Sequence, residues 1–344
     1  MWPIKLQRKS INNLIKALLM NKKTIKPTQP LLASTATNNL PKIGIVGLGI
    51  MGGVMAETLI QRGYKVVGYD IDPVAMKRLK KAGGQAVLSI KEISIDCSIV
   101  IVSLATSRAL SDVVSELSSA LKGTKKSCLV LETSTLPLSD KSSANAALTK
   151  AGALVMDCPI SGTAARMKDR AWTIYISGPK KALATAEQIF KVFTDNVPYV
   201  GKFGSGTKMK YAANHLVAIY NVAYAEVVTF ARKMDLDPAE MLKLFGNSPV
   251  LGTGVMRLRM PFMIERNYSP PTMKIQVWQK DMQVIGDMAK SVDCPLPLFT
   301  ACAPIYTSAM GQGLALEDTA STAEVLGSMA GIKPKKKKIG RAHV

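Results

Sequence analysis

The sequence is poor in histidine. Its 344 residues contain two, and one of them, His343, is the second-last residue, which leaves His215 in the body of the chain. A metal site or a catalytic triad centred on histidine needs partners that a single imidazole does not have here, and we predict no metal site. If this protein transfers protons near neutral pH, the carrier is therefore expected to be a lysine, a tyrosine or a carboxylate.

Long apolar runs and paired cysteines are also missing. The purest apolar run, SIVIVSLA, has the length of a strand, whereas a helix that crosses a membrane needs about eighteen such residues. We therefore expect a soluble protein without a membrane partner. The cysteines are odd in number and form no C-x-x-C pair, which predicts reduced core thiols in an intracellular compartment. They are Cys97, Cys128, Cys158, Cys294 and Cys302.

Acidic residues are absent from both ends of the chain, and this explains most of its formal charge of +21. Residues 1–41 hold seven Lys and Arg and residues 333–344 hold six, with no Asp or Glu in either segment. Removing these thirteen basic residues leaves +8 on the body, which lacks the interleaved basic and aromatic residues of nucleic-acid-binding surfaces. We expect no nucleic-acid partner for the folded body.

The two basic ends have different interpretations. Residues 1–41 are rich in Ser, Thr and Asn and contain an amphipathic stretch, INNLIKALLM. This is typical of a transit peptide for the mitochondrial matrix, and equally of a disordered extension or a translated leader, with Met20 as a later start, on a cytoplasmic protein. The last segment, KPKKKKIGRAHV, follows no fold pattern, and its lysine run is what a poly(A) tract encodes. We interpret residues from about Lys335 onward as an assembly artefact.

Between these ends the pattern changes from mixed strands and helices to helices alone. Helix-like segments separate the apolar runs KIGIVGLG, YKVVGYD, SIVIVSLA, SCLVLETS, ALVMD and WTIYISG. Fully apolar strands that alternate with helices predict a mostly parallel, doubly wound sheet, an α/β Rossmann domain over residues 42–203. From Gly204 the strand signals stop, and residues 204–332 are predicted to form an all-α C-terminal domain.

A glycine-rich turn follows the first predicted strand. The sequence IGIVGLGIMGGVMAE contains G-x-G-x-x-G as Gly47, Gly49 and Gly52. Between a strand and a helix, the first glycine allows a tight turn, the second lets backbone approach a pyrophosphate, and the third allows close packing. The free N–H groups of the helix start then face the phosphates. Dinucleotide binding is therefore predicted for Gly47, Leu48, Gly49, Ile50, Met51 and Gly52.

The second predicted strand ends at Asp70, eighteen residues after Gly52. A carboxylate at this place accepts hydrogen bonds from the adenosine ribose hydroxyls and repels a 2′-phosphate, so we predict NAD rather than NADP as the cofactor. The alternative is structural: Asp70 or Asp72 caps a helix that begins at Pro73.

Two lysines open the long helical run GSGTKMKYAANHL. At about 100° per residue, Lys208 and Lys210 lie about 200° apart and point to opposite sides of the helix. Steps of four and eleven residues from Lys210 reach Asn214 and Asn221, which form a polar row. An amine and an amide one turn apart can hold one small molecule, and burial would lower the amine pKa toward neutrality. Most lysines on helices are nevertheless solvated charges.

Five motifs, in order, resemble those of the β-hydroxyacid dehydrogenase family, which includes 3-hydroxyisobutyrate dehydrogenase, threonate dehydrogenase and glyoxylate reductases. IVGLGIMGGVM resembles the glycine signature of that family, LETSTLPL its D-x-S-T element and DCPISGT its D-A-P-V-S-G-G loop. GSGTKMKYAAN resembles its G-x-G-x-x-x-K-x-x-x-N helix, and WQKD its K-D element. The resemblance covers about residues 42–330.

The resemblance implies a role for each matching residue. Lys210 would be the catalytic lysine and Asn214 its partner. The substrate carboxylate would lie against Ser161, Gly162 and Thr163. The remaining cofactor contacts would come from Ser134 and Thr135 near the nicotinamide ribose, Leu104 near the adenosine-side ribose, and Lys280 over the cofactor. Two structural alternatives stay open: Ser134 and Thr135 could cap a helix near Pro137, and Asp281 could anchor a helix.

The sequence also departs from the family pattern. Glu132 replaces the usual Asp, Ala105 stands where a proline is common, and Ala213 replaces the first of two asparagines. The segment TAARMKDRAW lacks the usual glycines and holds three basic residues, so the substrate loop can differ in shape or in how it recognises an acid. These basic residues are Arg166, Lys168 and Arg170.

We therefore predict an NAD-dependent dehydrogenase of small hydroxy acids or semialdehydes, of the 3-hydroxyisobutyrate, threonate or tartronate semialdehyde type. Lys210 would act as general acid and base, and the family implies a homodimer or homotetramer. The alternative is a catalytically inactive NAD(P)-binding module that serves as a basic interaction scaffold. Such a module would have no need to keep Lys210 and Asn214 in register.

Overall fold

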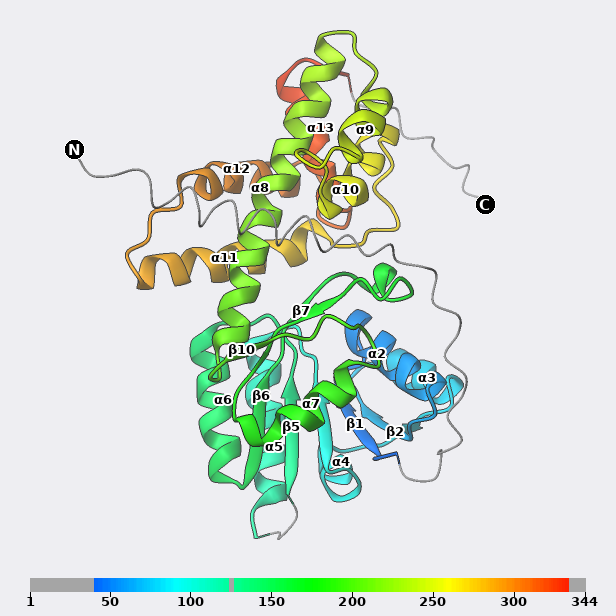
Figure 1. Ribbon diagram of the computed structural model, residues 1–344, viewed down its shortest axis with the longest axis vertical. Coiled ribbons are helices and arrows are strands. Elements are labelled where there is room, and N and C mark those ends of the chain that lie inside the picture. The colour runs from blue at the N-terminus through cyan, green and yellow to red at the C-terminus, as the bar shows by residue number, and fades with distance from the viewer. Residues whose placement is uncertain (1–39, 124–126, 334–344) are drawn as a thin grey trace, which may run out of the picture. The chain divides into compact units, whose positions relative to one another are not determined.

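A computed structural model describes residues 40–123 and 127–333 of the chain. The predicted basic extension, up to residue 39, and the segment interpreted as an artefact lie outside these residues. An α/β part comes first and a helical part follows it, as the colours of Figure 1 show. The strands are β1 (Ile43–Val46), β2 (Val66–Tyr69), β3 (Gln85–Ala86), β4 (Ile99–Val102), β5 (Cys128–Glu132), β6 (Ala153–Asp157), β7 (Ile160–Ser161), β8 (Thr173–Ile174), β9 (Ile176–Ser177) and β10 (Tyr199–Gly201).

The main sheet has the topology of a doubly wound fold. Its eight strands run in the order β10-β9-β6-β5-β4-β1-β2-β3, and the β6–β9 pair is antiparallel while the other pairs are parallel. The order reverses between β1 and β4, and ligands of such sheets bind in the crevice at this switch point. The predicted glycine turn follows β1, and Leu104 follows β4, so both lie at this crevice.

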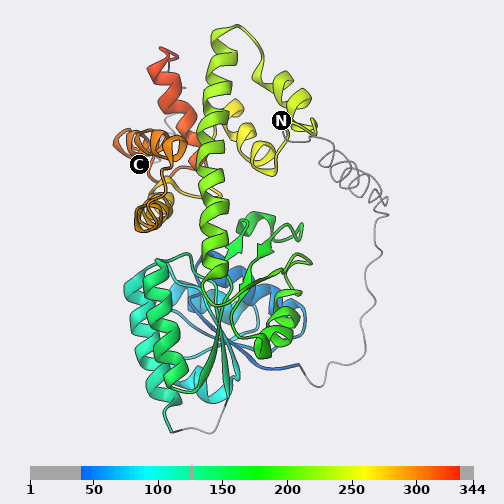
Figure 2. The same ribbon diagram turned by 60° about the vertical axis from the view of Figure 1, so that its left-hand side comes forward.

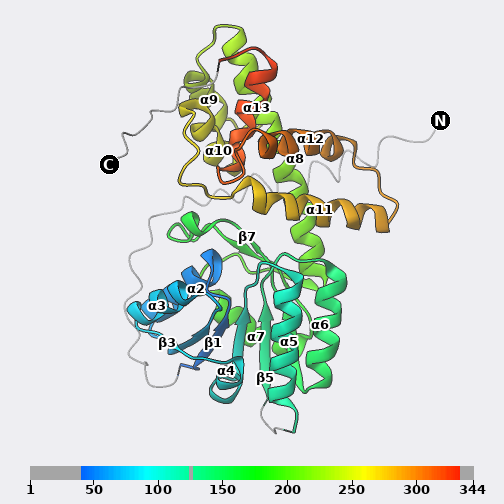
Figure 3. The same ribbon diagram turned by 180° about the vertical axis from the view of Figure 1, so that it is seen from behind.

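Helices cover both faces of the sheet (Figures 2 and 3). Ile99 and Ile101 of β4 belong to the core beneath α2, α3 and α7, whereas Val100 and Val102 belong to the core beneath α4, α5 and α6. Successive strand side chains point to opposite faces, so a strand buried on both sides must be apolar throughout. The helices are α2 (Ile50–Gln61), α3 (Pro73–Lys81), α4 (Ile90–Asp96), α5 (Ser107–Leu121), α6 (Leu138–Lys150) and α7 (Leu183–Phe190).

One predicted strand is divided in the structure. The run WTIYISG forms β8 and β9, which belong to two different sheets: β8 pairs with β7, and β9 joins the main sheet beside β6. The residue between them, Tyr175, donates its backbone N–H to the carbonyl of Pro159, 3.1 Å away. Apolar composition alone could not reveal this change of partner, because both short strands are buried.

The helical part is built around α8 (Ser205–Lys233), the helix predicted from the lysine-containing run. It begins beside β6 and β10, and the five helices that follow it in the described part of the chain all pack against it (Figure 1). Two apolar clusters fill this part. The other helices are α9 (Pro238–Gly246), α10 (Gly254–Glu265), α11 (Ile275–Ser291), α12 (Pro297–Gly311) and α13 (Thr322–Met329).

The structure can be compared with the sequence expectations about membrane-spanning helices and about the cysteines. None of the helices in the described ranges is long and apolar enough to cross a bilayer. The five cysteines all lie in the described residues and form no disulfide; four of them are buried as expected, whereas Cys294 is exposed.

Candidate active site

The three glycines of the predicted turn differ in what surrounds them. Gly47 has a φ of +90°, and a Cβ there would lie 2.1 Å from the carbonyl oxygen of Ser103. A Cβ on Gly52 would lie 1.9 Å from the carbonyl oxygen of Gly47. Gly49 is different, since a Cβ there would meet no atom of the described chain within 4 Å. Gly47 and Gly52 are thus required by the fold, and Gly49 leaves open space where a ligand can approach the backbone.

The three other predicted residues of this turn differ in their burial. The Leu48 side chain is buried, and its backbone N–H donates to Oδ2 of Asp70 at 2.6 Å. Ile50 is exposed and Met51 is half-buried at the start of α2, and no side chain caps this helix. The first N–H groups of α2 are therefore free to bind an anion.

Asp70 supports the turn and is not a helix cap. Its Oδ1 accepts the backbone N–H of Asp72 at 2.8 Å, and its Oδ2 accepts that of Leu48. The cap of α3 is Asp72, whose Oδ1 accepts the N–H of Val74 at 2.8 Å. The structural alternative is thus correct for Asp72, and the carboxylate of Asp70 stands at the end of β2, where an adenosine ribose would lie.

Arg78, which was not among the residues predicted from the sequence, also supports the glycine turn. Arg78, on α3, donates to the carbonyl oxygens of Leu48 and Gly49, the second at 3.1 Å. A Cβ on Gly53 would lie 2.0 Å from Nη2 of Arg78, so Gly53 leaves the room for the guanidinium. The signal in the sequence is the second glycine of the MGG run, one residue beyond the fingerprint.

The segment after β5 lies beside the end of β4. The hydroxyl of Ser134 accepts the backbone N–H of Leu104 at 2.8 Å, and the carbonyl oxygen of Thr135 accepts a short hydrogen bond from Nζ of Lys280. α6 begins at Leu138 without a side-chain cap, so the helix-cap alternative for Ser134 and Thr135 is wrong. The structure brings these four predicted cofactor residues together: two come from the segment after β5, one from the loop after β4 and one from α11.

Lys210 is buried in the structure and Lys208 is exposed, as their positions on α8 predict. Lys210 is 8% exposed and Asn214, one turn later, is 4% exposed. Asn214 donates from Nδ2 to Oδ2 of Asp281, at 2.8 Å, and Asp281 lies next to Lys280 on α11. Asp281 therefore fixes the orientation of the amide, which goes beyond anchoring its own helix.

Burial changes the acidity of the Lys210 amine. The pKa of Lys210 is lowered to about 8; desolvation is the main cause, the charge of Asp281 raises the pKa, and the charge of Lys280 lowers it. An amine with a pKa near 8 exchanges protons readily at physiological pH, which an ordinary lysine does not.

Lys210 and Asn214 line a cavity of about 360 Å³, and the predicted substrate loop forms another part of its wall. Ser161, Gly162 and Thr163 line this cavity, together with residues of α10 and α11. The loop is held by Trp172, whose indole N–H donates to the carbonyl oxygen of Thr163 at 2.7 Å and whose ring leaves space only for a glycine at position 162. A larger hollow, of about 750 Å³, lies between α11 and α12, and none of the predicted site residues lines it.

The three basic residues that distinguish the substrate loop point in different directions. Arg166 lines the cavity and forms an ion pair with Asp169, whereas Lys168 is exposed. Arg170 is turned away and binds the carbonyl oxygens of Lys191 and Val192. Only Arg166 among them can therefore contact a substrate in this cavity.

No group of three or more metal-binding side chains occurs among residues 40–123 and 127–333. The residues fit a nicotinamide dinucleotide instead. The open space at Gly49, the free start of α2 and the carboxylate of Asp70 all lie at the switch point of the sheet.

The chain is similar to known proteins over both of its parts. A family model described as "NAD binding domain of 6-phosphogluconate dehydrogenase" matches residues 42–201, and one described as "NAD-binding of NADP-dependent 3-hydroxyisobutyrate dehydrogenase" matches residues 204–326. L-threonate dehydrogenase of Cupriavidus necator is 26% identical over 284 residues, which cover 82% of this chain and 95% of that enzyme. The mitochondrial 3-hydroxyisobutyrate dehydrogenase of Rattus norvegicus is 28% identical over 295 residues, 83% and 86% of the two chains.

The fold agrees with a solved structure as well. The crystal structure of 3-hydroxyisobutyrate dehydrogenase from Salmonella typhimurium superposes with a TM-score of 0.74 at 24% identity, covering 83% of this chain and all of the other. The predicted fold class and the predicted binding of a nicotinamide dinucleotide are confirmed. With the glycine turn, the buried lysine and the matches over both parts of the sequence in agreement, the chain belongs to the β-hydroxyacid dehydrogenase family.

Proposed function

We propose that this protein is an NAD-dependent dehydrogenase that interconverts small hydroxy acids and their carbonyl forms, with Lys210 as general acid and base. The observation that carries the proposal is the burial of Lys210 beside Asn214 in a cavity that also contains the predicted carboxylate loop. Residues 42–203 would hold the cofactor, and residues 204–332 would supply the lysine. The coverage of the two matching family models supports this division.

Each part of the cavity would have one task. The backbone N–H groups of Ser161, Gly162 and Thr163 and the hydroxyls of Ser161 and Thr163 would hold the substrate carboxylate, and Asn214 would orient the substrate oxygen. Neutral Lys210 would accept the hydroxyl proton during oxidation, and its ammonium form would return the proton during reduction. A bound nicotinamide supplies the hydride acceptor or donor. Holding the reacting carbon in one orientation would account for much of the rate gain.

The proposal prefers NAD because of Asp70. Its carboxylate would accept bonds from the ribose hydroxyls and repel the 2′-phosphate of NADP. The scaffold alternative has no support from the comparisons, and a scaffold would not need a buried amine with a lowered pKa. The predicted dimer or tetramer and the predicted cytoplasmic or mitochondrial location stay predictions.

A substrate panel tests the proposed function. Short hydroxy acids and semialdehydes, among them 3-hydroxyisobutyrate, threonate, tartronate semialdehyde and succinic semialdehyde, are each combined with NAD(H) and NADP(H), and nicotinamide absorbance is followed. We expect turnover of at least one acid, with kcat/KM higher for NAD than for NADP. Absence of turnover with every pair would contradict the proposal, and a clear preference for NADP would contradict the role of Asp70.

The rate should depend on pH because Lys210 must be neutral to accept a proton. With a pKa of Lys210 of about 8, kcat/KM for oxidation should rise about tenfold per pH unit below pH 8 and level off above it. Reduction needs the ammonium form and should show the opposite dependence. Asp281→Asn removes a charge that raises the pKa of Lys210, so the midpoint should move to lower pH. A midpoint that stays fixed in this variant would assign the titration to another group.

A further inference from the structure

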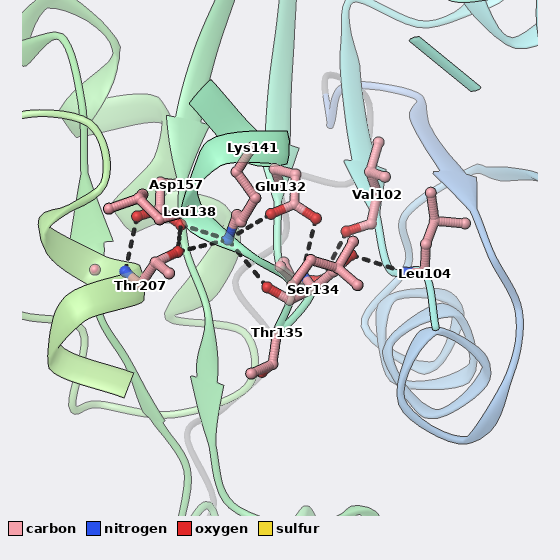
Figure 4. A network of polar contacts seen from close by, with 12 residues as sticks. Val102, Leu104, Glu132, Ser134, Thr135, Leu138, Lys141, Asp157 and Thr207 are labelled. Atoms are coloured by element: carbon pink, nitrogen blue, oxygen red, sulfur yellow. Dashed lines mark hydrogen bonds and ion pairs between the residues drawn. The ribbon is translucent and has the colours of Figure 1, made fainter. Parts of the chain in front are cut away.

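A fully buried ammonium group lies next to the candidate active site and has no part in the chemistry proposed above. Lys141, on α6, is 0% exposed, and its Nζ lies 2.6 Å from Oε2 of Glu132 and 2.6 Å from Oδ1 of Asp157. These carboxylates end the neighbouring strands β5 and β6. Figure 4 shows Lys141 between them, with its nitrogen directed at both.

One side of this cluster holds the segment predicted to contact the nicotinamide ribose. Lys141 Nζ donates to the carbonyl oxygen of Ser134 at 3.0 Å, and Oε1 of Glu132 accepts the N–H of Ser134 at 2.9 Å. The hydroxyl of Ser134 in turn binds the N–H of Leu104 (Figure 4). The Glu132–Lys141 pair therefore fixes the backbone of Ser134, the residue before Thr135.

The other side of the cluster holds the beginning of the catalytic helix. Oδ2 of Asp157 accepts the backbone N–H of Thr207 at 2.8 Å, and the Thr207 hydroxyl donates to Oδ1 of Asp157 at 2.7 Å. The same hydroxyl accepts from Lys141 Nζ at 2.8 Å. Thr207 lies in the first turn of α8, three residues before Lys210, so the cluster fixes the start of the helix that carries Lys210.

The charges of the cluster make it rigid. Burial by itself lowers the pKa of Lys141, but Glu132 and Asp157 raise it by more, so the net pKa is above that of an ordinary lysine and the side chain stays protonated. A charged group without solvent cannot exchange its partners for water, and moving any one of them leaves another charge unpaired. The Ser134 segment and the start of α8, which lie on the two sides of the cluster, are therefore held at a fixed distance from each other.

We propose that Lys141 is a positioning residue: through Glu132, Asp157 and Thr207 it sets the distance between the Ser134–Thr135 segment and Lys210. This inference rests on the proposed function, because the segment and Lys210 would hold the two reactants of one proton and hydride transfer. Lys141 is not among the residues that line the cavity, so its effect is exerted through the residues that it holds. A small displacement of reacting groups is sufficient to reduce a rate strongly.

Two variants break the cluster at different points. Lys141→Met removes the ammonium. Thr207→Val removes the hydroxyl that joins Lys141 and Asp157 to α8, while both ion pairs of Lys141 and the backbone hydrogen bond from Thr207 to Asp157 stay in place. We expect kcat to fall roughly tenfold in each, with Kd for NADH within about threefold of the unchanged protein. The deuterium isotope effect on hydride transfer should rise, because a misaligned transfer becomes rate-limiting.

The control is Lys150→Met, which removes an exposed lysine at the end of the same helix and should change neither kcat nor the isotope effect. Lys141→Met is expected to unfold at a lower temperature, because it leaves two buried carboxylates unpaired, so all rates are measured well below its transition. If this variant does not fold at all, Thr207→Val alone decides. Unchanged kcat and isotope effect in folded Thr207→Val would overturn the inference. An unchanged protein that is inactive with every acid would instead contradict the proposed function.

Discussion

Lys210→Ala is expected to lower kcat by about 10²- to 10⁴-fold, the range in which removal of a general acid or base acts. The reason is that Lys210 combines burial, a pKa lowered to about 8 and a place beside Asn214 in the cavity. Binding of NADH, which would rest on the glycine turn and Asp70, should change less than about threefold. The two quantities are measured by steady-state kinetics and by the fluorescence of bound NADH.

Lys208→Ala is the matched control for this experiment. It removes the same side chain from an exposed position two residues earlier, on the opposite side of α8, and should leave kcat unchanged. Lys210→Arg tests whether a positive charge alone is sufficient, because a guanidinium cannot lose its proton in the working pH range. Substantial turnover in either Lys210 variant would show that another group transfers the proton.

Gly49→Ala should weaken NADH binding by about 10- to 100-fold, since a steric misfit of about 1–3 kcal/mol acts at the site of the pyrophosphate. A Cβ at Gly49 meets no described atom within 4 Å, so the fold of the free protein can accept it. A thermal unfolding midpoint near that of the unchanged protein should accompany the loss of binding. Titration of NADH and a thermal unfolding curve measure the two effects separately.

The contrasting variant is Gly52→Ala. Its Cβ would lie 1.9 Å from the carbonyl oxygen of Gly47, so the turn itself must move. We expect this variant to lose both NADH binding and thermal stability. If Gly49→Ala bound NADH normally, the open space at Gly49 would not be where the pyrophosphate approaches the backbone.

Much of the architecture could be predicted because it depends on local patterns. The uninterrupted apolar runs that became β4 and β5 require burial on both faces, and this requirement predicted helices on each side of a parallel sheet. The run WTIYISG satisfied the same pattern and yet was divided between two sheets. Composition reports that a strand is buried, whereas the choice of its partner depends on where the rest of the chain lies.

In the candidate site, too, local geometry could be predicted from the sequence and long-range contacts could not. The rotation of an α-helix by about 100° per residue was sufficient to separate Lys210 from Lys208 and to place Asn214 beside Lys210. The support behind these residues was not visible in the sequence, because Asp281 is 67 residues from Asn214 and Thr207 is 66 residues from Lys141. Lys141 itself has the spacing of an ordinary helical lysine, and only its two buried carboxylate partners distinguish it.

The sequence by itself determined the alternation of strands and helices, the glycine turn and the face of α8 that carries Lys210, since each follows from the conformation of a few adjacent residues. The tertiary structure decided which charges are buried, which loops Arg78 and Trp172 hold, and how far the pKa of Lys210 falls. The physical reason is that desolvation and ion pairing depend on distances through space, which are fixed only when segments far apart in the chain pack together.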